Sequence, residues 1–135
     1  MFQTVLFSVN DSRESREAVE VVANVVQKYN SQLVLLSVLV PVADEAASQQ
    51  SMSDHEAISK LLEGAKTMFA QQGIQTEVME REGNPAFVIC DVADEIDANL
   101  IVMGSRGMGL TEEGISDSVT NRVVNLSPCP VLIVP

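Results

Sequence analysis

The stretch Leu100-Ile101-Val102-Met103-Gly104-Ser105-Arg106-Gly107-Met108-Gly109 decides the fold class of this chain. Four apolar residues, typical of a buried strand, run into a segment with three glycines in six residues. Glycines let a loop turn sharply and bring backbone N–H groups against a ligand. Asp117 and Ser118 then open a helical pattern, and the N-terminus of a helix attracts anions. The stretch predicts a strand and a glycine loop that feeds a helix, either as an anion site or as a tight turn without a ligand.

Outward from this stretch, apolar strands alternate with amphipathic helices. The predicted strands are Val5–Val9, Leu33–Val40, Ile74–Glu80, Leu100–Met103 and Val131–Val134. The residues predicted to form the core faces of the helices are Ala18, Val21, Val22, Val25, Val26 and Tyr29; Ile58, Leu61, Leu62, Ala65, Met68 and Phe69; Val88, Ile89, Val92 and Ile96; and Ile115, Val119, Val123 and Leu126. Five strands separated by four helices predict one α/β domain over residues 1–135, with a parallel sheet between two helical layers.

Local signals refine this outline. Asp11-Ser12-Arg13-Glu14 resembles a capping box, and Asn84-Pro85 supplies an N-cap with proline at the first helical position. Ile74–Glu80 is more polar than the other strands and is predicted to lie at a sheet edge. Val42–Ser53 has no periodicity, so we expect a mobile loop there, beside the crevice at the carboxyl end of the second strand.

Composition excludes several classes of function. The chain has 8 Lys and Arg against 19 Asp and Glu, a net charge of -11, and no Trp. Nucleic acids are bound through clustered cations and aromatic side chains, so no nucleic-acid partner is expected. Anionic membrane surfaces are disfavoured for the same reason, and no apolar run approaches the length of a transmembrane helix. The expected localisation is cytoplasmic.

The cysteines and the single histidine give little support for catalysis. Cys90 and Cys129 lie beside apolar neighbours and are expected to be buried thiols. His55 stands in a polar segment and is expected to be solvated, early in a helix. These three residues have no spacing typical of a zinc site, and no metal site is predicted.

Four separated segments resemble the universal stress protein family. They are Val102-Met103-Gly104-Ser105-Arg106-Gly107, Ser118 at its spacing from Gly107, Gly83-Asn84-Pro85, and the closing Ser127-Pro128-Cys129-Pro130-Val131-Leu132-Ile133-Val134. The resemblance spans the whole chain. It implies a Rossmann-like fold, similar to the adenine nucleotide alpha hydrolases, with strand order 3-2-1-4-5, and a homodimer through the C-terminal edge strand.

The resemblance also implies a nucleotide site. The ATP-binding branch of the family has the motif G-x2-G-x9-G-(S/T), an Asp after the first strand, and a backbone contact to the nucleoside at the end of the second. Carried onto this chain, the implied ligand-binding residues are Val9, Asn10, Val38, Met103, Gly104, Arg106, Gly107, Gly109, Asp117, Ser118 and Val119.

Two of these positions depart from the motif. Asn10 replaces the Asp and loses its charge, and Asp117 replaces the third glycine. Two unit charges about 4 Å apart interact by roughly 4 kcal/mol at an effective dielectric near 20, so a carboxylate beside a triphosphate would weaken binding greatly. Asp117 alternatively caps its own helix and occupies the anion site, or points to solvent.

Two functions remain open from the sequence. One is a cytoplasmic stress-response regulator with a degenerate pocket that binds ATP, ADP or AMP weakly and requires no cofactor. The other is a homodimer that works without nucleotide, with Asp117 in the anion site. No enzyme is expected, because no nucleophile is paired with a base and no cation is supplied for phosphoryl transfer.

Overall fold

The computed structural model describes the backbone of residues 1–10, 12–41, 47–105 and 115–135, and the side chains of these residues except 47–53 and 115–118. Strands and helices alternate in this part of the chain, as the sequence predicts. The elements are β1 Thr4–Ser8, α1 Arg13–Tyr29, β2 Gln32–Leu39, α2 Ala47–Ala70, β3 Thr76–Glu82, α3 Pro85–Glu95, β4 Leu100–Gly104, α4 Ile115–Leu126 and β5 Val131–Val134.

The five strands form one parallel sheet in the order β3-β2-β1-β4-β5. This confirms the predicted α/β fold class and strand order. β1 lies at the centre, between β2 and β4, and β3 lies at an edge as its polar sequence predicts. The chain reverses its direction of travel across the sheet between β1 and β4, and ligands of such sheets bind at the carboxyl ends of the strands at this reversal.

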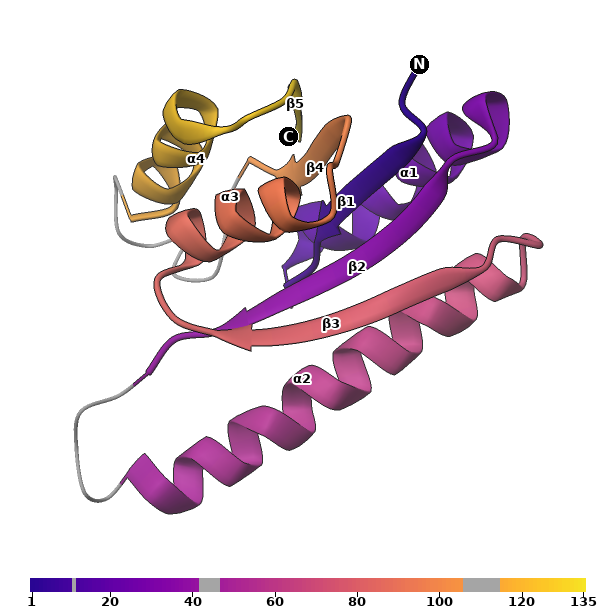
Figure 1. The fold of residues 1–135 in the computed structure, drawn as a ribbon. Coiled ribbons are helices and arrows are strands. Elements are labelled where there is room, and N and C mark those ends of the chain that lie inside the picture. Colours follow the sequence, from indigo (N-terminus) through magenta and orange to yellow (C-terminus); the bar gives the residue numbers. More distant parts are fainter. Residues whose placement is uncertain (11, 42–46, 106–114) are drawn as a thin grey trace.

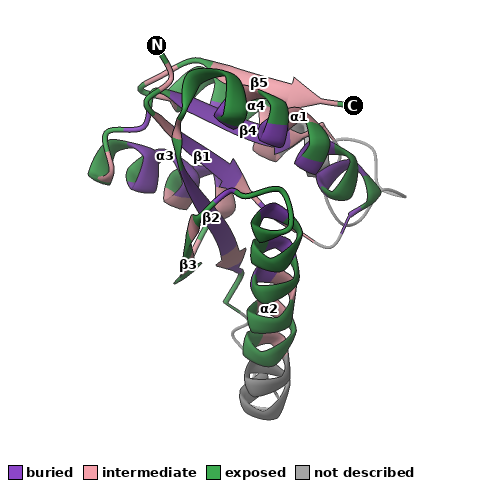
Figure 2. Cartoon of the chain, turned by 90° about the vertical axis from the view of Figure 1, so that its right-hand side faces the viewer, coloured by how far each residue is buried: buried purple, intermediate pink, exposed green. Residues whose placement is uncertain are grey.

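Two apolar layers cover the sheet (Figure 1). One packs α1 and α2 against side chains such as Leu33 and Leu35, and the other packs α3 and α4 against Val34 and Leu36. Because successive side chains of a strand point to opposite faces, β2 is buried on both sides. Figure 2 shows the result: β1, β2 and β4 are buried, while α2 buries only one side.

The start of α1 differs from the predicted capping box. Ser12 is the N-cap, and its Oγ accepts a hydrogen bond of 3.0 Å from the backbone N–H of Ser15. Glu14, which the predicted box pairs with Asp11, is buried in the first turn of the helix, and its Oε2 has no hydrogen-bond partner among the described residues. A serine hydroxyl in extended conformation satisfies a free N–H of the first turn equally well, so the cap moves by one residue.

The start of α2 is a second correction. Residues 47–53 belong to this helix, whereas the sequence predicts a loop as far as Ser53; residues 42–46 of that loop lie outside the described part. Small and polar residues carry no apolar periodicity, yet a helix with a packed C-terminal half extends through them. His55 accordingly lies in the interior of the helix and pairs through Nδ1 with Oε1 of Glu80 on β3.

The predicted core faces are mostly confirmed. Leu62, Ala65 and Phe69 of α2 are buried, and the Phe69 ring meets Phe7 of β1 edge to face at 6.2 Å between centroids. The exceptions lie at the margins of the helical stripes, where a side chain turns away from the sheet. Exposed residues that were predicted to face the core are Tyr29, Met68 and Leu126.

The two cysteines are free thiols, as expected for small apolar residues. Cys90 is buried and Cys129 half-buried, both in the layer under α3 and α4. Burial raises the pKa of both thiols; the neighbouring Asp91 raises that of Cys90 further. A raised pKa keeps a thiol protonated and therefore unreactive.

Candidate functional site

The carboxyl end of β1 forms one wall of the candidate site. Val9 is buried and donates its backbone N–H to the Leu36 carbonyl at 2.7 Å, while the Asn10 N–H donates to Ser15 Oγ at 3.1 Å. These bonds hold the turn between β1 and α1. The side-chain Oδ1 of Asn10 is buried without a partner among the described residues. An unpaired buried acceptor costs about 1–3 kcal/mol, so this oxygen favours a ligand that brings a donor.

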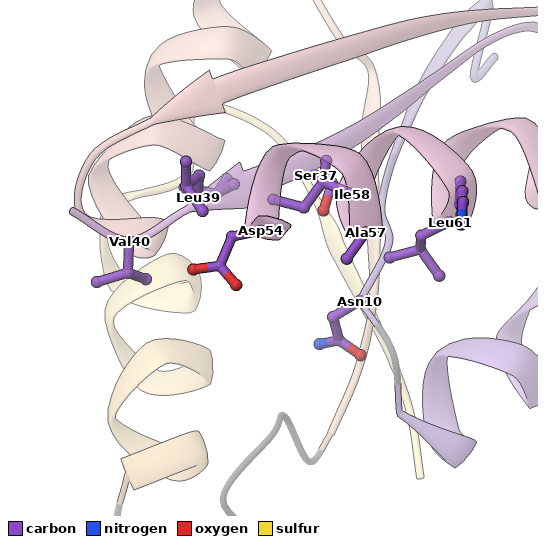
Figure 3. Close-up of a pocket in the computed structure, with 10 residues that line it drawn as sticks. Asn10, Ser37, Leu39, Val40, Asp54, Ala57, Ile58 and Leu61 are labelled. Atoms are coloured by element: carbon purple, nitrogen blue, oxygen red, sulfur yellow. The ribbon is translucent and has the colours of Figure 1, made fainter. Parts of the chain in front are cut away.

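A pocket of about 530 Å³ opens between the end of β2 and α2, with Asn10 on its far side (Figure 3). The pocket is mainly apolar, with a few polar groups, which is typical of small-molecule sites. Its lining residues are Asn10, Ser37, Val38, Leu39, Val40, Asp54, Ala57, Ile58, Lys60 and Leu61. The structure thus brings together two of the predicted site residues, Asn10 and Val38.

Val38 reaches this pocket chiefly through its main chain. Its side chain packs in the layer under α3 and α4, whereas the α2 that lines the pocket belongs to the other layer. Val38 is therefore suited to present its backbone N–H and C=O, as the family resemblance implies. Ser37 and Leu39, its neighbours on β2, alternate to the face covered by α2.

Gly104, at the end of β4, has a packing role that the sequence does not reveal. A Cβ built on Gly104 would lie 2.9 Å from the Cβ of Glu14 and 3.3 Å from the backbone N of Ser15. β4 and the first turn of α1 therefore meet so closely that only glycine fits. The absence of a side chain at position 104 is explained by this contact, whether or not a ligand is bound.

The remaining predicted site residues are divided between the core and the part of the chain outside the described residues. Met103 is buried and Val119 half-buried, both in the layer under α3 and α4. Arg106, Gly107 and Gly109 lie outside the described residues. Asp117 and Ser118 lie in the first turns of α4, but their side chains are outside the description, so the competing roles of the Asp117 carboxylate stay predictions.

Sequence reasoning missed the contribution of α2 to the site. Asp54, Ala57, Ile58 and Leu61 line the pocket at spacings of three and four residues, so they share one face of the helix. The sequence contained a signal for this contribution, because Asp54 lies one helical turn before the apolar stripe of Ile58 and Leu61. Lys60 also lines the pocket and adds a cation to its rim.

Neither a metal site nor a membrane span emerges in the described part of the chain. No three His, Cys, Asp or Glu side chains there are grouped closely enough to hold a metal ion. None of the helices described combines the length and apolarity that crossing a bilayer requires.

The fold and the pocket define a Rossmann-like α/β protein with a crevice at the carboxyl ends of its strands. The model of the universal stress protein family matches residues 1–135. A universal stress protein of Synechocystis, Sll1654, is 56% identical, over 100% of this chain and 87% of its own length. YxiE of Bacillus subtilis is 31% identical over 99% of both chains. The chain belongs to the universal stress protein family.

Solved structures agree on the fold. A universal stress protein from Lactobacillus plantarum superposes with a TM-score of 0.88 over 99% of this chain and 98% of its own, at 20% identity. A universal stress protein in complex with cAMP gives 0.78, at 24% identity over 98% and 97% of the two chains. One from Archaeoglobus fulgidus in complex with dAMP gives 0.77, at 18% identity over 100% of both.

Proposed function

We propose that this universal stress protein is a cytoplasmic stress-response regulator that binds an adenine nucleotide weakly in a degenerate pocket. The observation that carries the proposal is the pocket between β2 and α2, which contains Asn10 and the Val38 main chain. Its volume of about 530 Å³ suffices for a nucleoside. Two universal stress proteins of the same fold have been solved in complex with cAMP and with dAMP, so a nucleoside monophosphate is the first ligand to test.

Weak binding follows from two substitutions in the family motif. Asn10 keeps hydrogen-bonding groups but has no charge, and Asp117 puts a carboxylate in the chain where the motif has its third glycine. A carboxylate beside phosphates repels them in proportion to their charge. AMP should therefore be disfavoured less than ATP.

Titration calorimetry with AMP and ATP tests this proposal. Asp117→Gly completes the glycine pattern and should raise ATP affinity at least about tenfold, which is about 1.4 kcal/mol. The gain should be smaller for AMP and should shrink as salt screens the charges. Glu63→Gln, an exposed acid on α2 that does not line the pocket, is the matched control for loss of one charge. Equal ATP affinity in wild type and Asp117→Gly would refute the role given to Asp117.

The proposed role is binding without catalysis. The single histidine of the chain is paired with Glu80 at the edge strand, which leaves no imidazole beside a nucleophile in the pocket. General-base chemistry most often uses histidine. Incubation of the protein with ATP should leave the nucleotide intact. Release of phosphate that scales with the amount of this protein, and persists after the protein is purified again, would contradict this part of the proposal.

A homodimer that works without nucleotide is the second candidate function. β5 lies at the edge of the sheet, and all four of its residues, Val131–Val134, are apolar and only half-buried. An apolar edge strand with unpaired backbone groups favours pairing with a second strand. Light scattering should give the mass of a dimer at micromolar concentration, and mass spectrometry of the purified protein should reveal whether a nucleotide accompanies it. A monomer at that concentration would refute pairing through β5.

A further inference from the structure

We propose that Asp54 of α2 selects the base of the bound nucleotide, by accepting a hydrogen bond from the exocyclic amine of adenine. The inference rests on the proposed nucleotide binding and adds a residue to it. It assigns to α2 a role in ligand choice, because the carboxylate disfavours bases that present a carbonyl oxygen at the same position, such as hypoxanthine and guanine.

The pocket combines apolar walls with hydrogen-bond acceptors. Leu39 at the end of β2, Val40 directly after it, and Ile58 and Leu61 of α2 supply aliphatic surface for a flat ring. The Asn10 Oδ1 is buried and unpaired at one side. The chemistry of this lining suits a ring that carries hydrogen-bond donors.

Asp54 provides a further acceptor in the lining of the pocket. Figure 3 shows its side chain on the α2 wall, in the region between Val40 and Asn10, with the carboxylate directed away from the helix. Asp54 is half-buried and makes no hydrogen bond or ion pair with the other described residues. A carboxylate accepts and never donates when it is ionised, so it distinguishes an amine from a carbonyl. Lys60 also lines the pocket and adds a cation to a lining that is otherwise apolar or acceptor-bearing.

Contacts of neighbouring residues fix the face of α2 that carries Asp54. His55, the next residue, pairs with Glu80 of β3, and Ile58, one turn on, packs against the core. Adjacent residues of a helix point about 100° apart, so the pairing of His55 with β3 and the packing of Ile58 on the core turn the face that carries Asp54 toward the pocket. The helix face that carries Asp54 is thus in place before a ligand binds, so only the freedom of the Asp54 side chain is lost on binding.

The test compares AMP, IMP and dAMP by titration calorimetry. IMP differs from AMP in presenting a carbonyl oxygen in place of the amine, and dAMP lacks only the 2′-hydroxyl. Wild type should bind AMP at least about tenfold more tightly than IMP. Asp54→Asn keeps the shape of the side chain but can either donate or accept, so the preference for AMP over IMP should fall to about threefold or less. Glu56→Gln, an exposed acid two residues along α2, is the matched control and should keep the wild-type preference.

The outcomes separate this inference from the proposed function. Absence of binding of all three ligands to wild type at millimolar concentration would overturn both. Binding of AMP with an unchanged preference over IMP in Asp54→Asn would overturn the role of Asp54 alone. A change confined to the ratio of AMP to dAMP would also overturn it, because Asp54 would then bind the sugar. Urea unfolding of each variant verifies that the titrated protein is folded.

Discussion

Replacement of Gly104 by alanine tests the close approach of β4 to the first turn of α1. The new Cβ would lie 2.9 Å from the Glu14 Cβ and 3.3 Å from both the Glu14 carbonyl carbon and the Ser15 N. Carbon atoms in contact prefer about 3.5–4.0 Å, so β4 and α1 would have to separate by roughly 0.6–1 Å. The opposing atoms are a Cβ and main chain at the start of a packed helix, which cannot rotate away as a side-chain end can.

The expected cost is that of overpacking a rigid core, about 1–3 kcal/mol. Urea unfolding followed by circular dichroism measures it as a lower midpoint with an unchanged slope. Gly64→Ala is the matched control. Gly64 lies in the interior of α2 with nothing within 4 Å of an added Cβ, so alanine there should stabilise the protein by up to about 1 kcal/mol. The two glycine-to-alanine changes should therefore differ by about 1–4 kcal/mol.

The measurement uses protein freed of ligand, so that only the packing of β4 against α1 changes between the variants. A Gly104→Ala variant as stable as wild type would show that β4 and α1 can separate without loss. The glycine would then be needed only for the approach of a ligand, and the packing role assigned to it would be wrong.

Two further predictions concern caps and thiols. Ser12→Ala removes the Oγ that accepts a hydrogen bond from the Ser15 N–H at 3.0 Å, and it should lower the free energy of unfolding in urea by about 1 kcal/mol. Asn84→Ala removes a longer and exposed cap bond, of 3.4 Å to the Phe87 N–H, and should lower it less. Equal losses in the two variants would contradict this ranking. The raised pKa values of Cys90 and Cys129 mean that unfolded thiols ionise first as pH rises. Their contribution to stability is complete below about pH 8.5 and is lost as pH rises through the pKa of the folded protein. The unfolding free energy of Cys90→Ala should therefore decrease less steeply at alkaline pH than that of wild type. An equally steep decrease in both proteins would refute this.

The sequence by itself determined the class of fold and the order of its elements. Apolar runs such as Leu100–Met103 and the stripe of Leu62, Ala65 and Phe69 report burial directly, since their periods match a strand and a helix. The family motif placed Asn10 and the end of β2 near a ligand, and the structure brings both to one pocket. These features are local in sequence or shared with relatives.

Only the tertiary structure decided which residues complete the site. The start of α2 at Ala47 could not be read from small polar residues, since the packing of the rest of the helix extends it. Asp54 and Lys60 share a pocket with Asn10 only because α2 packs beside the carboxyl end of β2, and Gly104 meets Glu14 only because α1 returns across β4. Contacts of this kind depend on the relative position of elements distant in sequence, which no local period encodes.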